Sequence, residues 1–381
     1  MRALLLLLSL GICTASYAQS PPPNSPLAAP APSIAARSFL LLDYRSQQTL
    51  AGKNENERVE PASLTKLMTA YLTFQALKQK VIQPGQAVPV SERASKAEGS
   101  RMFIEPRKPV TVEELMRGMI VQSGNDACIA LAELISGGED AFAQAMNAQA
   151  QKLGMKNTNF MNSTGLSNPQ HYSTARDLAL LAIAIIRDFP EYHPLYAMKE
   201  YRYNNITQAN RNRLLWSDPT VDGMKTGFTE NAGYCLITSA RRGERRLLSV
   251  VLGTASDTAR ATESQKLLNY GFQYYDSVKL YEKSQTIASL QVWKGAANTV
   301  KAGFLDDLYV SLPKGQADKV KASLESRQPL LAPVSAGQNI GVMKLTLDGK
   351  PYAELPVVAL EDVALAGILG RGWDSIRLLF K

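Results

Sequence analysis

The pattern of apolar and polar residues divides the chain into segments that predict different structures. Residues 3–12 are mostly apolar, follow one positive charge at Arg2 and precede a small-x-small site at residues 16–18. This order is typical of a cleaved signal peptide, and the apolar run is shorter than the roughly 20 residues of a transmembrane helix. We therefore predict a signal peptide over residues 1–18 and export of the remaining chain. Residues 19–35 are rich in Pro, Ala and Ser and predict an extended linker.

The segment 36–283 combines strand and helix patterns and is predicted to form one domain. Two short apolar runs flank a turn within residues 38–52, and a second such pair lies within residues 232–255, so each segment predicts an antiparallel hairpin. Between and after these hairpins, apolar residues recur at helical spacing. The predicted helical segments start after Pro61 and lie within residues 112–153, 174–187 and 258–276. Strands at both ends with helices between them predict an α+β domain, in which one antiparallel sheet packs on a helical cluster.

Residues 284–362 have a different character and predict a second, smaller domain. Short runs of alternating apolar and polar residues, such as residues 287–293 and 306–312, follow one another. Turn residues separate them, among them Pro313-Lys314-Gly315 and Asp348-Gly349. This spacing predicts an all-β domain of the sandwich type, and no residue pattern in it indicates catalysis.

The last segment, residues 363–381, places apolar residues on one broad helical face. Four charged residues interrupt the remainder, so the segment is unsuited to crossing a membrane. We predict an amphipathic helix that lies in the membrane interface with Trp373 at the level of the headgroups. A helix docked on the protein itself is the alternative, and several glycines in the segment lower its helix propensity.

Composition narrows the classes of function. The formal net charge is +8 at pH 7, and the basic residues are scattered except for a cluster at residues 241–246, which predicts a solvated hairpin turn. There is no basic stripe with interleaved aromatic residues, so no nucleic-acid partner is expected. A mildly positive surface suits an anionic substrate or a lipid surface.

Cysteine and histidine usage argues against a metal centre. The chain has two histidines, His171 and His193, and no Cys/His cluster with metal-ligand spacing, so we expect neither a metal nor another cofactor. Cys128 and Cys235 remain after removal of the signal peptide, and both lie among apolar residues. We predict that they are buried free thiols rather than a disulfide.

Three short motifs carry the candidate chemistry: Ser63-Leu64-Thr65-Lys66, Ser123-Gly124-Asn125 and Lys225-Thr226-Gly227. The first motif alone is weak evidence for an active site, because average residue usage produces an S-x-x-K pattern about once in a chain of this length. All three in this order are expected by chance in fewer than about one chain in a hundred. The combination therefore indicates one site built from three parts of the chain.

The first motif places a nucleophile beside a base. Residues three apart share a helix face, so the Lys66 amine can reach the Ser63 hydroxyl. A serine becomes a good nucleophile when a neighbouring base takes its proton, and a lysine can act as that base if burial or another cation lowers its pKa. Lys225 is a candidate for this second cation. An N-cap serine with an exposed lysine is the alternative for the motif taken alone.

The other two motifs supply polar groups of the kinds that such a nucleophile needs. Ser123 and Asn125 lie between two predicted helices, where their side chains can relay a proton and hold a substrate amide. Lys225 and Thr226 precede a predicted strand and can bind a carboxylate, while Gly227 lets a substrate backbone approach closely. Each triplet alone is compatible with an ordinary turn.

These motifs resemble those of the penicillin-recognising serine enzymes, and most closely the low-molecular-weight D-alanyl-D-alanine carboxypeptidases of the penicillin-binding protein 5/6 type. The resemblance extends beyond the triplets to EPASLTKLMTAYL, QSGNDACIALAE, YSTARDLALLA, NRNRLLW, VDGMKTGFTENAGYCL and ATESQKLLNYGF. It includes the β-rich second domain and the tail, and so covers nearly the whole chain after the signal peptide. The implied fold of the first domain is that of β-lactamases and transpeptidases.

The resemblance implies a role for each motif residue. Ser63 would be acylated, Lys66 would be its general base, and Ser123 with Asn125 would assist proton transfer and hold the substrate. Lys225, Thr226 and Gly227 would bind the terminal D-alanine.

Further residues follow from the same resemblance. The backbone N–H groups of Ser63 and Phe228 would form an oxyanion hole. Arg211 and Arg260 resemble arginines near the substrate carboxylate, and Asp177 resembles a residue that supports the site from behind. Phe228 departs from the pattern, because some members have His there.

The activity implied is removal of the terminal D-alanine from peptidoglycan pentapeptide stems, with β-lactam antibiotics as covalent inhibitors. The implied location is the periplasmic face of the cytoplasmic membrane, with the C-terminal helix on the membrane surface. The segment 91–106 looks shorter than in some relatives, which leaves the substrate preference open.

Other functions share part of this pattern. A D,D-endopeptidase acting on peptidoglycan cross-links has the same motifs but usually lacks the β-rich domain and tail. A class A β-lactamase needs a Glu in an E-x-x-L-N segment between the second and third motifs, and the chain has none. A catalytically inactive wall-binding scaffold is disfavoured because every motif side chain is present. A Ser-His-Asp hydrolase is disfavoured because no G-x-S-x-G occurs.

Overall fold

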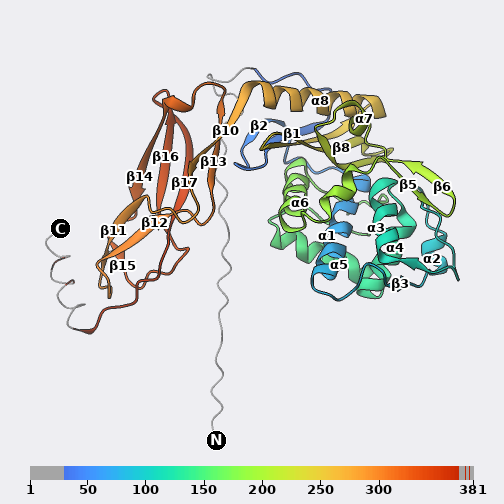
Figure 1. Cartoon of the computed structure of the whole chain (residues 1–381), viewed down its shortest axis with the longest axis horizontal. Coiled ribbons are helices and arrows are strands. Elements are labelled where there is room, and N and C mark those ends of the chain that lie inside the picture. The colour runs from blue at the N-terminus through green and yellow to red at the C-terminus, as the bar shows by residue number, and fades with distance from the viewer. Residues whose placement is uncertain (1–29, 369–373, 375–376, 378–381) are drawn as a thin grey trace, which may run out of the picture. The chain divides into compact units, whose positions relative to one another are not determined.

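The computed structural model describes residues 30–368, 374 and 377 and divides the chain into two compact units (Figure 1). The predicted signal peptide and most of the predicted linker lie outside the described residues, as does most of the predicted C-terminal helix. One unit ends at Tyr275 and the other begins at Asp276. Among the described residues, no helix combines the length and apolar character needed to cross a membrane.

The first unit is built on a five-stranded antiparallel sheet in the order β2-β1-β9-β8-β7. Both predicted hairpins are part of it. Pairing of β1 with β9 joins them and places Leu41 opposite Ser249. The strands are β1 (Ser38–Asp43), β2 (Thr49–Lys53), β7 (Val221–Thr229), β8 (Gly233–Arg242) and β9 (Arg245–Thr254). Since β7 is an edge strand, one side of it is open to other groups.

The sheet is covered on both faces, which explains its uninterrupted apolar runs. In β1, Leu40 and Leu42 belong to the core shared with the helical cluster. The alternate residues Phe39 and Leu41 belong to a second core with Leu267 of α8 (Asp257–Tyr274). Figure 1 shows α8 on the face of the sheet opposite the helical cluster.

The helical cluster confirms the helices predicted from apolar spacing. At its centre is α1 (Lys66–Lys78), which is buried along almost its whole length. The other longer helices are α3 (Val112–Val121), α4 (Asn125–Ser136), α5 (Glu139–Lys152) and α6 (Ala175–Asp188). Short elements complete the unit: η1 (Ala62–Thr65), α2 (Glu92–Ser95), η2 (His193–Ala197), α7 (Leu214–Ser217), and the strand pairs β3 (Ala87–Val88) with β4 (Val110–Thr111) and β5 (Glu200–Tyr203) with β6 (Ile206–Ala209).

Capping residues determine where several of these helices start. Thr111 forms a capping box with Glu114 at α3, and the hydroxyl of Thr174 accepts a hydrogen bond from a backbone N–H in the first turn of α6. Ser256 does the same for α8. These side chains satisfy N–H groups that have no partner inside a helix.

The second unit confirms the predicted all-β domain. Its main sheet has six strands in the order β14-β16-β17-β12-β11-β15, and β10 pairs with β13 in a separate two-stranded sheet. The hydroxyl of Tyr352 donates a hydrogen bond to the Ser311 carbonyl and so joins the two sheets. The elements are β10 (Tyr275–Tyr281), β11 (Ala288–Trp293), β12 (Thr299–Gly303), β13 (Leu308–Pro313), η3 (Ala317–Lys319), β14 (Val320–Ser326), β15 (Leu330–Leu331), β16 (Asn339–Leu347) and β17 (Lys350–Ala359).

The boundary between the units lies earlier than the sequence pattern suggested, at 275/276 rather than 283/284. The reason is β10, which starts at Tyr275 and pairs with β13 of the second unit. β10 follows α8 directly, without a loop, so no turn residues mark in the sequence where the second unit begins.

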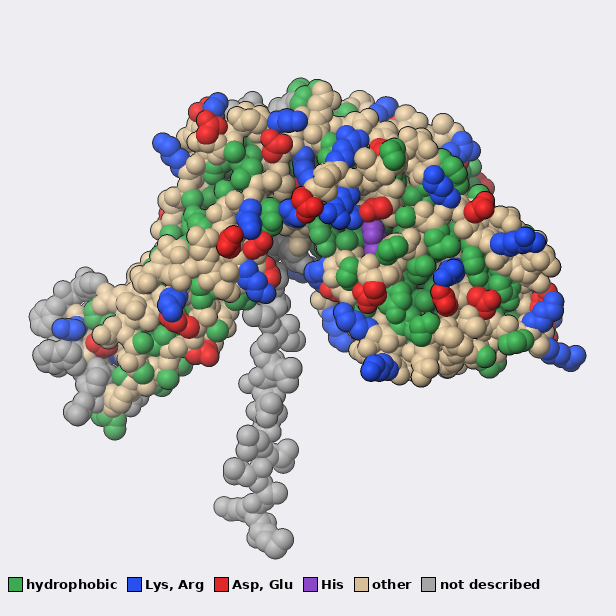
Figure 2. All heavy atoms as spheres, in the orientation of Figure 1, with side chains coloured by type: hydrophobic (Ala, Val, Ile, Leu, Met, Phe, Trp, Pro, Cys, Tyr) green, Lys and Arg blue, Asp and Glu red, His purple; other side chains and the backbone are tan. Residues whose placement is uncertain are grey.

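Charged side chains of opposite sign are interspersed over much of the surface that Figure 2 shows. The arginine-rich segment 241–246 is one example, because Glu244 pairs there with Arg241 and also with Arg45. This segment forms the tip of the β8–β9 hairpin, as predicted.

Candidate active site

The three motifs meet at one cleft of about 590 Å³ in the first unit. Ser63, Ser123, Asn125, Thr226 and Gly227 all line it, although they come from η1, the α3–α4 connection and β7. The full lining is Ser63, Gly99, Ser100, Ser123, Asn125, Thr164, Gly165, Leu166, Ala209, Asn210, Arg211, Arg213, Thr226, Gly227, Phe228, Thr229, Tyr234, Asp257 and Arg260. The two motif lysines are buried behind this surface.

Ser63 and Lys66 lie in contact at the start of the central helix. Ser63 is in the 3₁₀ turn η1 rather than in the α-helix itself, and Lys66 is the first residue of α1. In a 3₁₀ turn residues three apart lie almost directly above one another, which brings the two side chains together. The Lys66 Nζ donates hydrogen bonds to Ser63 Oγ at 2.9 Å and to the Thr164 carbonyl at 2.6 Å.

The surroundings of Lys66 lower the proton affinity of its amine. Its side chain is buried, and burial, helped by the positive charge of Arg211, lowers the pKa of the amine to about 8. An amine with this pKa is neutral in a substantial fraction of molecules near neutral to mildly alkaline pH. In that form it can accept a proton from Ser63.

The second motif presents unpaired polar atoms to the cleft. Ser123 has a φ of 69°, a left-handed conformation that a serine adopts only when its surroundings enforce it. Within the described residues, Ser123 Oγ and Asn125 Oδ1 are buried and have no hydrogen-bond partner. Asn125 Nδ2 donates to the Glu98 carbonyl at 2.6 Å, which fixes the orientation of the amide. Buried polar atoms of this kind are normally satisfied, so a ligand in the cleft is their natural partner.

One buried carboxylate holds the wall of the cleft next to this motif. Asp126, in the first turn of α4, accepts hydrogen bonds from the backbone N–H groups of Met102 at 2.9 Å, Phe103 at 2.8 Å and Ile104 at 3.2 Å. Residues 99 and 100 of the same segment line the cleft. Asp126 thus fixes one wall of the site to the helix that carries Asn125.

The third motif lies on the edge strand β7. The Lys225 side chain is buried, and its Nζ donates to the Thr226 carbonyl at 3.0 Å. Burial lowers its pKa strongly, and the charge of Lys66 lowers it further. Gly227 was expected to admit a substrate backbone. In the structure its Cα instead faces the turn before Ser63, and a Cβ there would lie 3.1 Å from the Pro61 carbonyl oxygen.

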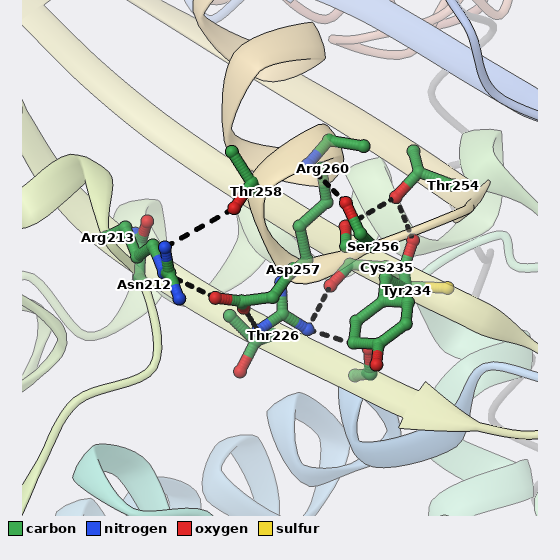
Figure 3. A network of polar contacts seen from close by, with 12 residues as sticks. Asn212, Arg213, Thr226, Tyr234, Cys235, Thr254, Ser256, Asp257, Thr258 and Arg260 are labelled. Carbon is green, nitrogen blue, oxygen red and sulfur yellow. Dashed lines mark hydrogen bonds and ion pairs between the residues drawn. The ribbon is translucent and has the colours of Figure 1, made fainter.

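The two candidate arginines differ in their surroundings. Arg211 is exposed, and the described part of the chain offers it no hydrogen bond or ion pair. Arg260 is buried, forms an ion pair with Asp257 and donates to the Gly227 carbonyl at 3.1 Å (Figure 3). Both line the cleft, yet only Arg211 has a free guanidinium.

Comparison with known proteins agrees with this geometry. A family model described as D-alanyl-D-alanine carboxypeptidase matches residues 25–256, and one described as penicillin-binding protein 5, C-terminal domain, matches residues 275–365. The chain belongs to the D-alanyl-D-alanine carboxypeptidase family. The predicted family, enzyme class and first-domain fold are therefore confirmed.

Individual relatives of this family match over most of their length. D-alanyl-D-alanine carboxypeptidase DacC of Escherichia coli (strain K12) is 43% identical over 358 residues, which is 92% of this chain and 90% of that protein. The crystal structure of penicillin binding protein 5 from Haemophilus influenzae is similar with a TM-score of 0.83 at 42% identity, covering 88% of this chain and 99% of that one. Penicillin-binding protein D2 from Listeria monocytogenes, solved in its ampicillin-bound form, has a TM-score of 0.59 at 30% identity and covers 64% of this chain and 100% of that one.

Two other candidate residues lie in or near the cleft. Phe228 lines the cleft with 42% of its surface exposed and packs on Tyr234, with ring centroids 4.3 Å apart. Asp177 lies outside the cleft lining, where it accepts hydrogen bonds from the Asn157 N–H at 2.7 Å and the Thr158 hydroxyl at 2.8 Å. It thereby supports the segment that leads to the Thr164 carbonyl.

The histidines and cysteines take no direct part in the cleft. His171 is buried with its Nε2 3.0 Å from Thr65 Oγ1, and burial lowers its pKa to about 4. Cys128 and Cys235 are buried free thiols, as predicted. In the part of the chain that the structure describes, no group of three or more His, Cys, Asp or Glu side chains could hold a metal ion.

Sequence reasoning missed the segment 162–166. The Thr164 carbonyl accepts from Lys66, and a backbone carbonyl leaves no signature in residue type. Gly165 has a φ of +83°, and a Cβ there would lie only 1.8 Å from the Ala62 carbonyl oxygen. The Asn-Ser-Thr-Gly sequence indicates a turn at this point but not its contacts with Ala62 and Lys66.

We predict that Asp126→Ala lowers the free energy of unfolding by about 3 kcal/mol, because three backbone N–H groups lose a charged acceptor. It also slows acylation of the protein by a fluorescent penicillin, since the segment 98–104 is no longer fixed. Urea denaturation and stopped-flow labelling measure the two effects. Asp140→Ala is the matched control, because Asp140 is also a first-turn aspartate but is exposed. Equal losses in both variants would contradict the structural role of Asp126.

Proposed function

We propose that the chain is a serine D-Ala-D-Ala carboxypeptidase that removes the terminal D-alanine from peptidoglycan pentapeptide stems through an acyl-enzyme at Ser63. The family membership supports the reaction class. The observation that carries the residue assignment is the 2.9 Å hydrogen bond between the buried Lys66 amine and Ser63 Oγ at the cleft.

In the acylation step, neutral Lys66 takes the proton of Ser63 as Oγ bonds to the carbonyl carbon of the penultimate D-alanine. The N–H groups of Ser63 and Phe228 stabilise the oxyanion. Collapse of the tetrahedral intermediate breaks the peptide C–N bond, and the leaving D-alanine nitrogen receives the proton held by Lys66 through Ser123, which returns Lys66 to its neutral form. The unpaired Ser123 Oγ beside the cleft supports this relay.

In the deacylation step, water attacks the Ser63 ester and gives its proton to Lys66. The ester bond breaks, Ser63 Oγ recovers a proton, and the shortened stem leaves as a carboxylic acid. The same two residues thus serve both half-reactions in opposite directions.

The proposed substrate lies along the open edge of β7. Thr226 and Arg211 line the cleft and face the terminal carboxylate with a hydroxyl and a positive charge, while Lys225 lies buried behind them. Asn125 holds the amide of the stem through its unpaired Oδ1. Phe228 supplies an apolar surface where some relatives have His.

β-Lactams are proposed to acylate the same serine. Their amide is strained and their leaving group stays tethered in the site, so hydrolysis of the adduct is slow. The ampicillin-bound form of the Listeria relative supports this part of the proposal.

The proposed location is the periplasmic face of the cytoplasmic membrane. A signal peptide over residues 1–18 would direct export, and the amphipathic segment 363–381 would hold the protein on the membrane surface. Both segments lie wholly or largely outside the described residues, so the support is their sequence pattern.

The activity is tested with two substrates. We expect D-alanine release from a pentapeptide-bearing muropeptide and little cleavage of a cross-linked dimer, measured by chromatography of the products. Ser63→Ala abolishes both this release and labelling by a fluorescent penicillin, whereas Ser95→Ala retains them, because Ser95 is a half-buried serine on α2 outside the cleft lining. Faster cleavage of the cross-linked dimer would instead identify the endopeptidase alternative, and unchanged labelling of Ser63→Ala would remove Ser63 as the nucleophile.

The pH dependence tests Lys66 as the base. Lys66 must be neutral to accept the proton, and its pKa is lowered to about 8, so the acylation rate rises roughly tenfold per pH unit below that value and levels off above it. The second-order rate constant for penicillin acylation, measured between about pH 6 and pH 10, gives this profile. Arg211→Gln removes a positive charge that lowers the pKa, so its profile moves to higher pH. A flat profile in the unsubstituted protein would exclude Lys66 as the titrating base.

Membrane binding is tested by flotation with liposomes. We expect the mature chain to co-float and a variant truncated after Glu361 to stay in the dense fraction, because the apolar face of residues 363–381 is lost. Circular dichroism of the truncated variant checks that the two units remain folded. If the truncated variant floats as the intact chain does, the tail is not the anchor.

A further inference from the structure

The buried side of the cleft contains an arginine whose contacts differ from those of a substrate ligand. We propose that Arg260 is a positioning residue that orients the Gly227–Phe228 peptide group for oxyanion binding and, unlike Arg211, does not bind the substrate carboxylate. This inference rests on the proposed function and refines the shared role that the family resemblance implies for the two arginines.

The hydrogen bonds of Arg260 go to the protein's own backbone. Its Nη1 donates to the Gly227 carbonyl at 3.1 Å and lies 3.5 Å from the Cys235 carbonyl, so it touches β7 and β8 at paired positions. Its guanidinium carbon also lies 5.6 Å from the centre of the Tyr234 ring. The side chain is 4% exposed, so few directions remain from which a ligand could reach it.

The charge of Arg260 is already compensated. Asp257, one turn earlier in α8, forms an ion pair with it (Figure 3). Asp257 also pairs with Arg213, so this carboxylate lies between two guanidinium groups. A substrate carboxylate approaching Arg260 would meet Asp257 beside it, which disfavours direct binding.

The start of α8 is itself fixed to the sheet. Ser256 caps the helix, and the Thr254 hydroxyl is within hydrogen-bond distance of the Tyr234 and Ser256 carbonyls. Arg260 therefore extends from a rigid first turn, which is the condition for one side chain to hold a peptide group in place.

The peptide group that Arg260 contacts is the one that matters for the reaction. The Gly227 carbonyl and the Phe228 N–H belong to the same trans peptide, so they point in opposite directions. A charged donor on the carbonyl fixes the orientation of the group and increases the polarity of its N–H. The Phe228 N–H is the proposed oxyanion donor, and β7 is an edge strand whose outer side is open to the substrate.

Arg211 has the opposite properties. It is exposed, lines the cleft, and has no ion pair within the described residues. Ser63 lines the same cleft, and the positive charge of Arg211 lowers the pKa of both Lys66 and Lys225. It is therefore the arginine available to a carboxylate.

The test compares substrates with and without the carboxylate. Diacetyl-L-lysyl-D-alanyl-D-alanine is used as the free acid and as the C-terminal amide, together with a peptide boronic acid that has no carboxylate. The Ser63 oxygen bonds to boron and gives up its proton to Lys66, and one oxygen of the resulting tetrahedral boronate occupies the oxyanion position.

For Arg260→Lys we expect kcat to fall about 10- to 100-fold for acid and amide alike, with KM for the acid changed less than about threefold. Inhibition by the boronic acid weakens by a similar factor, because lysine offers one point charge in place of the planar fork. For Arg211→Gln, measured on the pH plateau so that the shifted pKa of Lys66 does not contribute, we expect the KM for the acid to rise about tenfold or more, with little change for the amide or the boronic acid. Arg241→Lys, at an exposed end of β8, is the control and leaves all three unchanged.

A defect of Arg260→Lys that is confined to the acid, with boronic acid binding retained, would overturn the proposal and make Arg260 a carboxylate ligand. If Arg260→Lys does not fold, the same measurements on Asp257→Asn test the proposal, because this variant keeps Arg260 but removes its counter-ion. We then expect a several-fold loss of kcat for acid and amide together, and a loss for the acid alone counts against the proposal. Failure of the unsubstituted protein to release D-alanine would instead reject the proposed function.

Discussion

The arrangement of the cleft in the first unit depends on the burial of the Lys66 amine. Lys66 lies at the start of the central helix, with its Nζ between the Ser63 hydroxyl and the Thr164 carbonyl. A buried ammonium is costly unless it is hydrogen-bonded, and burial therefore both lowers the pKa of Lys66 to about 8 and requires acceptors around it. The burial that favours the proposed role of this lysine as the base also determines which groups must surround it.

The surrounding structure meets this requirement through close approach of distant segments. Gly165 allows the segment with the Thr164 carbonyl to lie against Ala62, and Gly227 allows β7 to lie against the turn before Ser63. At the wall of the cleft next to Asn125, Asp126 fixes the segment 98–104 to α4. Contacts made by the backbone thus hold the walls of the cleft together. The segments that carry the motif side chains are therefore fixed to one another.

Much of the fold was predictable because local patterns agreed with the tertiary structure. The uninterrupted apolar runs of β1 and β9 reflect a sheet buried on both faces, and the apolar spacing after Pro61 reflects the central helix. β10 was misplaced because it follows α8 directly, with no turn residues to mark the boundary. The wall formed by the segment 162–166 was missed because its contributions are a carbonyl and a glycine conformation, neither of which residue type reveals.

The sequence by itself determined the class of the protein, because the three motifs, their order and the two domain patterns are properties of residue type and spacing. Only the tertiary structure decided which residues of the same type are buried and which partners they contact. Arg211 and Arg260 are both arginines near the third motif, yet one is exposed without an ion pair in the described chain and the other is buried against Gly227 and Asp257. Burial and partners depend on contacts between residues far apart in sequence, such as the 98 positions between Lys66 and Thr164, and only the folded chain brings these together.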